Sequence, residues 1–179
     1  MNKLTLFLFI IGIVLVSGCT DSGTGKNMET VKEGDYITVD YIGAREDGTL
    51  FDTSIEDAAI EGGIYDRKRQ YEPLGFTVGA KQMIPGFDKG VVGMAVGEEK
   101  TLTLPPEEAY DEYNEELILT ISLEELESVG IFPAVGDKLG PQQVLVINVT
   151  DTEVKLDYNH ELAGKTLIFK VTLVSIGQE

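Results

Sequence analysis

One short stretch of the chain breaks the alternation of hydrophobic and polar positions that surrounds it. Phe87, Val91 and Met94 recur at spacings of four and three, which places them on one face of about two helical turns. Pro85 marks the start of this stretch and Gly97 its end. The pattern predicts one small helix laid on a sheet, with an apolar pocket beside the helix.

Period-two alternation on either side of this helix predicts strands. The expected strands are residues 36–42, 50–53, 76–78, 101–104, 117–121, 142–149, 153–156 and 167–174. Asp47 and Gly48 give a hairpin signal between the first two strands. Residues 55–71 form a polar, charge-mixed insertion, which we expect to be a bulge or a short helix in a mobile flap.

The sequence changes character after Tyr110, where a charged loop leads into a second group of strands. Ser122 and Glu125 fit a capping box at the start of a short helix. Residues 112–157 therefore predict a small second unit. Because such a unit has a limited core of its own, we expect it as an insert held at both ends by the sheet domain.

The composition argues against several classes of functional site. The chain has 179 residues, and 14 basic against 31 acidic side chains give 14 − 31 = −17, a charge that repels nucleic acid. With one cysteine, Cys19, and one histidine, His160, the chain can form no intrachain disulfide and no Cys/His zinc cluster. The single histidine also argues against Ser-His or Cys-His nucleophiles. We expect no cofactor, no metal and no nucleic-acid partner.

The N-terminus has the features of an export signal. Lys3 is followed by an apolar run, residues 4–16, that is shorter than a membrane-spanning helix needs. Residues 16–19 (Val-Ser-Gly-Cys) resemble a lipobox, with cleavage before Cys19 and a lipid on its thiol. The alternative is an uncleaved anchor with an incidental cysteine. We expect a signal peptide at 1–18, a lipidated tether at 19–30, and a protein exported to the outer face of the cell membrane.

Several short motifs follow one another in order between residues 31 and 176. They include residues 39–43 (Val-Asp-Tyr-Ile-Gly), 51–54 (Phe-Asp-Thr-Ser), 84–88 (Ile-Pro-Gly-Phe-Asp) and 105–110 (Pro-Pro-Glu-Glu-Ala-Tyr). This ordered set resembles the FKBP family of peptidyl-prolyl cis–trans isomerases. Residues 159–167 (Asn-His-Glu-Leu-Ala-Gly-Lys-Thr-Leu) resemble the re-entry sequence of its SlyD-like branch, which carries an insert-in-flap chaperone domain.

The resemblance implies an α+β fold, a strongly bent antiparallel half-barrel wrapped around one short helix. Residues 31–111 and 158–179 would form this isomerase domain, and residues 112–157 the inserted β-rich chaperone domain. Position by position, the family's catalytic residues correspond to Asp52, Tyr110 and Tyr41. Its substrate-binding positions correspond to Phe51, Leu74, Phe76, Met83, Ile84, Phe87 and Phe169.

Three departures from the family pattern concern the pocket and its surroundings. Phe87 stands where many members have tryptophan, and Asp111 replaces the usual glycine after Tyr110. The flap at 55–71 is long, so we assign none of its residues a role. For His160 a structural hydrogen bond is favoured over a catalytic role.

The implied activity needs no covalent chemistry. Rotation about an X-Pro bond has a barrier of ~18–20 kcal/mol because it breaks amide resonance. An apolar pocket favours the twisted amide, and the Tyr110 hydroxyl can follow the turning carbonyl oxygen. Asp52 either acts directly or only caps a turn.

The expected partners are proline-containing unfolded or partly folded polypeptides and, through the N-terminus, a membrane, with the protein itself a monomer. A pyrrolidine ring contributes only about 2.4 kcal/mol by burial, so a second client-holding module would help. Residues 112–157 are the candidate for this module, with an apolar surface available from Leu117, Leu119, Ile121, Val144, Val146 and Val154. The alternative function is a tethered binding module that holds extended chains without turnover. The joint presence of Tyr41, Phe51, Asp52 and Tyr110 favours the isomerase.

Overall fold

The computed structural model describes residues 29–177, so the expected signal peptide and Cys19 lie outside the described residues. The strands are β1 Tyr36–Arg45, β2 Leu50–Thr53, β3 Leu74–Thr77, β4 Glu99–Leu104, β5 Ile118–Ser122, β6 Lys138–Leu139, β7 Val144–Val149, β8 Glu153–Asp157 and β9 Leu167–Ile176. The α-helices are α1 Glu56–Glu61, α2 Pro85–Gly90 and α3 Leu123–Ser128, with 3-10 turns at Pro106–Glu108 and Glu115–Leu117. Between residues 29 and 177, no helix is long and apolar enough to cross a membrane.

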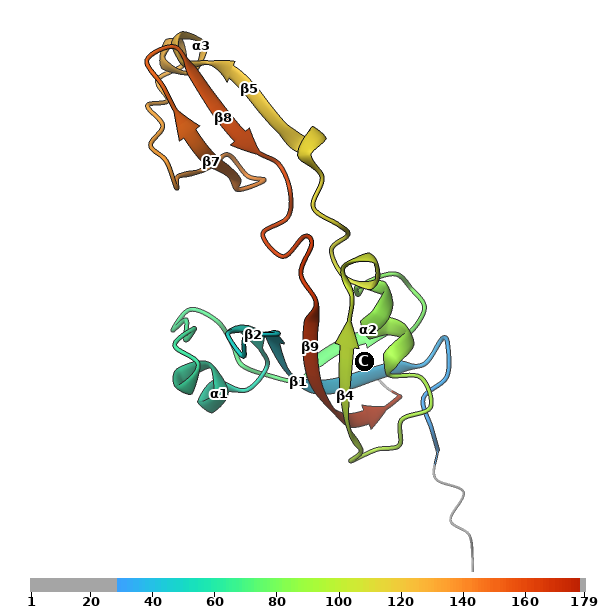
Figure 1. Ribbon diagram of the computed structural model, residues 1–179. Helices are drawn as coiled ribbons and strands as arrows, with labels where there is room; N and C mark the ends of the chain where they lie inside the picture. The colour runs from blue at the N-terminus through green and yellow to red at the C-terminus, as the bar shows by residue number, and fades with distance from the viewer. Residues whose placement is uncertain (1–28, 178–179) are drawn as a thin grey trace, which may run out of the picture.

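The first sheet has five strands in the order β2-β1-β9-β4, with β3 also paired to β1, and every pairing is antiparallel. Side chains of β1 alternate, so Ile37, Val39 and Tyr41 are buried on one face, and α2 covers this core (Figure 1). The register of β1 shifts at Gly43 against β2 and at Thr38 against β9. Such irregularities bend and twist a strand.

The central helix is shorter than the sequence pattern predicts. α2 ends at Gly90, and the chain then turns through Gly93, whose φ of 84° is a left-handed conformation that favours glycine. Phe87, Val91 and Met94 are nevertheless all buried in the same core. The spacing therefore identified the buried face correctly, although only Phe87 lies within the helix itself.

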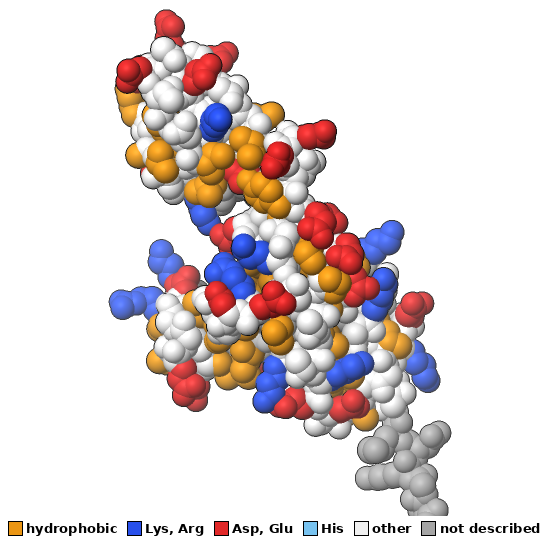
Figure 2. Space-filling model, viewed as in Figure 1, with side chains coloured by type: hydrophobic (Ala, Val, Ile, Leu, Met, Phe, Trp, Pro, Cys, Tyr) orange, Lys and Arg blue, Asp and Glu red, His pale blue; other side chains and the backbone are white. Residues whose placement is uncertain are grey.

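The second sheet contains β5-β8-β7-β6 and has its own small core of Val144, Val146, Val154 and Leu156. The expectation of Val144, Val146 and Val154 as an exposed apolar surface is wrong, because alternate residues of β7 and β8 point into this core. The surface of this part still exposes other hydrophobic side chains (Figure 2).

The expected capping box at Ser122 does not form. Ser122 is the N-cap of α3, as predicted, but its hydroxyl makes no capping hydrogen bond. Ser122 is also the last residue of β5 and pairs with Glu153, so its backbone is held by the sheet. The N–H of Leu123 donates to the Thr152 carbonyl at 2.9 Å. Strand pairing therefore orients the start of this helix.

Two chain segments join the second sheet to the first, one outgoing after the 3-10 turn at Pro106–Glu108 and one returning before β9 (Figure 1). Asn114 and Asn159 link these segments. The Asn114 N–H donates to Oδ1 of Asn159, and the Asn159 amide donates to the Asn114 carbonyl, both at 2.9 Å. The entry to and exit from residues 118–157 therefore lie side by side.

Candidate active site

A cavity of about 590 Å³ opens between the first sheet and the start of α2. The predicted site residues except Phe76 line it, together with Gln82 and Pro85, which the sequence reasoning did not select. The lining comprises Tyr41, Phe51, Asp52, Leu74, Gln82, Met83, Ile84, Pro85, Phe87, Tyr110 and Phe169. Residues from both sides of the 112–157 segment thus meet in one pocket, as the resemblance implied.

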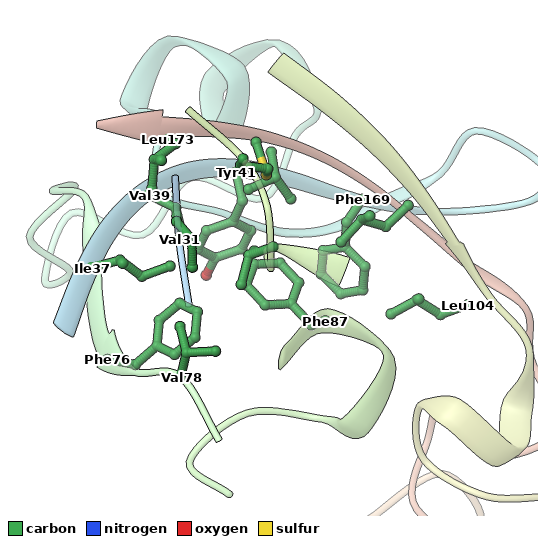
Figure 3. Close-up of a cluster of buried hydrophobic side chains, with 14 of the residues drawn as sticks. Val31, Ile37, Val39, Tyr41, Phe76, Val78, Phe87, Leu104, Phe169 and Leu173 are labelled. Carbon is green, nitrogen blue, oxygen red and sulfur yellow. The ribbon is translucent and has the colours of Figure 1, made fainter. Parts of the chain in front are cut away.

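Phe76 lies behind the pocket. It is only 1% exposed, and its ring centroid lies 5.9 Å from that of Phe87 (Figure 3). Its place on β3 turns the side chain into the core, because Gly75 and Thr77 occupy the other face of the strand. Phe76 therefore supports the pocket floor and does not line the cavity.

The floor is built from aromatic rings that meet edge to face. The Phe87 centroid lies 5.2 Å from Phe169 at 78° and 6.2 Å from Tyr41 at 82°, while Phe51 meets Phe169 at 5.5 Å and 88°. This is the arrangement that aromatic quadrupoles favour. Gly43 permits it, since a Cβ there would stand 2.8 Å from the Phe51 ring and 2.9 Å from that of Phe169.

One edge of the pocket is polar. The Tyr41 phenol donates a 2.6 Å hydrogen bond to Oδ2 of Asp52, whose Oδ1 accepts from the Thr53 N–H at 2.9 Å. The Arg69 guanidinium pairs with Asp52 and also donates to the Tyr41 oxygen at 3.1 Å. Burial, followed by the Asp52 carboxylate, raises the pKa of Tyr41 to about 12. Tyr41 is therefore a neutral donor over the whole physiological range.

Arg69, at the polar edge of the site, was also missed from the sequence, because no flap residue was assigned a role. The flap contains the predicted short helix, α1, and Arg69 follows it in the return to β3. A usable signal was present: residues 67–69 (Arg-Lys-Arg) are a basic run in a strongly acidic chain. Such a run favours a carboxylate partner.

Hydrogen bonds within the motif at residues 51–54 hold Tyr41 in place. The Thr53 hydroxyl donates to the Tyr41 carbonyl at 2.7 Å, and the Tyr41 N–H donates to the Ser54 hydroxyl at 2.9 Å. The Ser54 hydroxyl in turn donates to Oδ1 of Asp40 at 2.8 Å. These bonds join the end of β2 to β1 and so set the position of Asp52 against Tyr41.

Tyr110 stands at the other edge, at the end of the turn that follows Pro106–Glu108. Burial raises the pKa of the Tyr110 hydroxyl, with smaller contributions from the carboxylates of Asp52 and Glu161. Asp111 has a φ of 62°, a left-handed conformation, which accounts for the glycine usual here in the family. Its carbonyl accepts from the Gly164 N–H at 2.8 Å, so the returning segment closes this turn.

His160 packs on Tyr110 from that returning segment. The two rings stack with centroids 3.8 Å apart and an angle of 1°. Nδ1 of His160 accepts a hydrogen bond from the Leu162 N–H at 3.1 Å, which is the structural bond expected for this residue. Within residues 29–177, no group of three or more His, Cys, Asp or Glu side chains is placed to hold a metal ion.

Comparison with known proteins identifies the protein family to which the chain belongs. The family model of FKBP-type peptidyl-prolyl cis-trans isomerases matches residues 27–174. The chain is 47% identical over 143 residues to a short-type peptidyl-prolyl cis-trans isomerase of Methanocaldococcus jannaschii, covering 79% of this chain and 90% of the relative. The chain belongs to the family of FKBP-type peptidyl-prolyl cis-trans isomerases, which confirms the prediction from its motifs.

Two further relatives show how the similarity extends along the chain. An FKBP-type peptidyl-prolyl cis-trans isomerase SlyD of Aeromonas hydrophila is 32% identical over 145 residues, 78% of this chain and 61% of the relative. FK506-binding protein 2 of Yarrowia lipolytica is 39% identical over 82 residues, 46% of this chain and 48% of the relative. The sheet-dominated fold with few helices and antiparallel pairing is consistent with this family.

Proposed function

We propose that this protein accelerates cis–trans isomerisation of X-Pro bonds in folding polypeptides, with the cavity at Tyr41, Phe87 and Phe169 as the proline site. The observation that carries the proposal is the combination of an aromatic floor with one hydrogen-bonded polar edge. The floor takes the pyrrolidine ring and favours the twisted amide, which is less polar than the planar form. The Tyr110 hydroxyl is a donor for the turning carbonyl oxygen.

A proline-limited peptide assay on the full chain tests this function. The unmodified protein is expected to accelerate isomerisation, and Tyr110→Phe and Asp52→Asn are expected to lower kcat/KM by about tenfold or more. Glu33→Gln, an exposed change outside the cavity, serves as the control. No acceleration by the unmodified protein would leave the alternative, a binding module without turnover.

The finer domain organisation is part of the proposal. Residues 31–111 and 158–179 act as a bent half-barrel isomerase domain, and residues 112–157 as an inserted domain that holds clients. Support comes from the separate core of the second sheet and from its exposed hydrophobic side chains, among them Val129 at 69% and Phe132 at 75%. The exposed side chains of Val129, Ile131, Phe132 and Val135 are close together in the sequence, and apolar side chains exposed in one region are typical of interaction surfaces.

An apolar groove on this second part strengthens its assignment as a client site. Its cavity of about 440 Å³ is lined mainly by hydrophobic side chains, including Ile121, Leu126, Ile131 and Leu139. Burying an apolar side chain there adds roughly 1.5–3 kcal/mol, comparable to what a proline ring gains in the first pocket. Two weak sites on one chain raise the effective concentration of the client.

The proposed place of action is the outer face of the cell membrane, with the lipid anchor on Cys19. The support is the sequence of residues 1–19 alone, an apolar run followed by a lipobox-like end. Cys19→Ser is expected to abolish metabolic labelling with a fatty acid and to release the protein from the membrane fraction. Membrane attachment that survives this substitution would support the uncleaved anchor instead.

A further inference from the structure

The stack of Tyr110 on His160 joins the two chain segments that lead to and from the second sheet. Tyr110 lines the proposed proline site, whereas His160 lines a neighbouring polar cavity of about 510 Å³ between the returning segment and the second sheet. The ring planes are nearly parallel, with an angle of 1° and centroids 3.8 Å apart. One face of the Tyr110 ring is therefore covered by a side chain that enters from the far side of residues 112–157.

The His160 ring is itself held in place. Its Nδ1 accepts a hydrogen bond from the N–H of Leu162, two residues further along the chain, at 3.1 Å. This bond fixes the plane of the imidazole against the backbone. The next residue, Glu161, contacts the opposite part of the molecule, because its carboxylate pairs with Lys138 Nζ of β6 at 2.8 Å. Both partners of that ion pair are largely exposed, and such ion pairs contribute little to the free energy of folding. The stack on half-buried Tyr110 is the stronger connection.

We propose that His160 is a positioning residue that holds the Tyr110 phenol in its productive orientation at the proline site. The inference rests on the proposed function, in which the Tyr110 hydroxyl follows the carbonyl of the rotating amide. A phenol whose face is free rotates away from that path, whereas the His160 ring restricts it to a narrow range. The imidazole acts through its flat face and needs no proton transfer.

Two substitutions separate this role from a purely structural one. His160→Phe keeps a flat ring on Tyr110 but loses the acceptor for the Leu162 N–H. His160→Asn loses the ring but keeps an acceptor for the same N–H, because an Asn side chain bonds the backbone two residues on. We expect His160→Asn to lower kcat on a short proline peptide roughly two- to tenfold with KM nearly unchanged, and His160→Phe to retain near-normal kcat.

The assay uses the full chain, with thermal unfolding of each variant measured beside it. Loss of kcat in His160→Phe but not in His160→Asn, or losses that follow the melting temperature, would overturn the proposal. A Tyr110→Leu background gives a further control, in which His160→Asn should cause no additional loss. An equal additional loss in that background would show that His160 acts elsewhere.

NMR of the Tyr110 ring protons separates failure of this inference from failure of the proposed function. His160→Asn should move these signals, because it removes the ring current of the imidazole. His160→Phe should keep a ring-current shift on them, because a flat aromatic ring still covers Tyr110. Signals that do not move would overturn the stack, and moved signals with unchanged kcat would overturn the positioning role while the isomerase activity stands. An unmodified chain without isomerase activity would overturn both.

Discussion

The phenol of Tyr41 donates a 2.6 Å hydrogen bond to Asp52 from a side chain that is only 6% exposed. The same ring packs edge to face against Phe87, so one residue belongs both to the apolar floor and to the polar edge. Burial and the neighbouring carboxylate both oppose ionisation of this phenol, which raises its pKa to about 12. The donor to Asp52 is therefore present at every pH at which the protein works.

Tyr41→Phe tests this relationship through stability at high pH. The folded-state pKa of about 12 exceeds the ordinary tyrosine pKa of about 10, so Tyr41 contributes stability that is complete below about pH 10 and is lost as pH rises through about 12. A difference of about two in pKa corresponds to roughly 2.7 kcal/mol as an upper bound. Urea unfolding at about pH 9 and about pH 11 should show a steeper loss for the unmodified protein than for Tyr41→Phe. Equal losses would contradict the assigned pKa.

Phe87→Ala is expected to remove the pocket floor. Phe87 is 3% exposed and touches three other aromatic rings, so its deletion leaves a cavity and should cost about 3–5 kcal/mol of unfolding free energy. Val92→Ala, in the exposed turn just after α2, is the matched control and should change stability by less than about 0.5 kcal/mol. Chemical denaturation measures both. Similar small effects would show that the floor is not a packed core.

Sequence alone identified most of the pocket because its residues lie in local motifs. Residues 51–54 are an example, since Thr53 and Ser54 bind the Tyr41 backbone and Phe51 and Asp52 then face the cavity. The buried positions of the central helix were also predictable from their spacing. Its end was not, because Val91 and Met94 are buried by tertiary contacts after the helix has stopped at Gly90.

Contacts between distant loops could not be predicted in the same way. Arg69 reaches Asp52 across 17 residues only because the flap folds back, and neither spacing nor periodicity specifies that path. The stack of His160 on Tyr110 likewise depends on how the returning segment closes. Val144 is a third case, since alternation in a short strand does not say which face a second small core will bury.

Arg69→Ala should affect turnover more than stability. The Arg69 and Asp52 side chains are 40% and 38% exposed, so their ion pair is screened and contributes at most about 1 kcal/mol. Its removal frees the Asp52 carboxylate beside Tyr41, and we expect kcat/KM to fall by up to about fivefold. Arg69→Lys keeps the charge but cannot bridge Oδ1 of Asp52 and the Tyr41 hydroxyl oxygen as the guanidinium does. An intermediate loss of kcat/KM is therefore expected. Full activity in Arg69→Ala would exclude a role for the flap in the site.

Removal of residues 112–157 should separate peptide turnover from client refolding. Asn114 and Asn159 are hydrogen-bonded in the intact protein, so a short Gly-Ser linker can close the gap between residues 111 and 158. The pocket residues and His160 all remain. Turnover of short proline peptides should therefore be spared, whereas refolding of a proline-limited protein should slow strongly, because the second holding site is gone.

A full-length variant provides the control for this deletion. Val129→Ser with Phe132→Ser removes two exposed hydrophobic side chains and leaves the core of the second sheet intact. This double variant should keep its melting temperature and its short-peptide activity, and it should lose part of the refolding activity in the same direction as the deletion. Fluorescence follows the refolding rate of the proline-limited protein, and a separate peptide assay measures the short-peptide turnover. An equal loss on both substrates in the deletion would contradict the division of labour, since it would mean that residues 112–157 support the pocket itself.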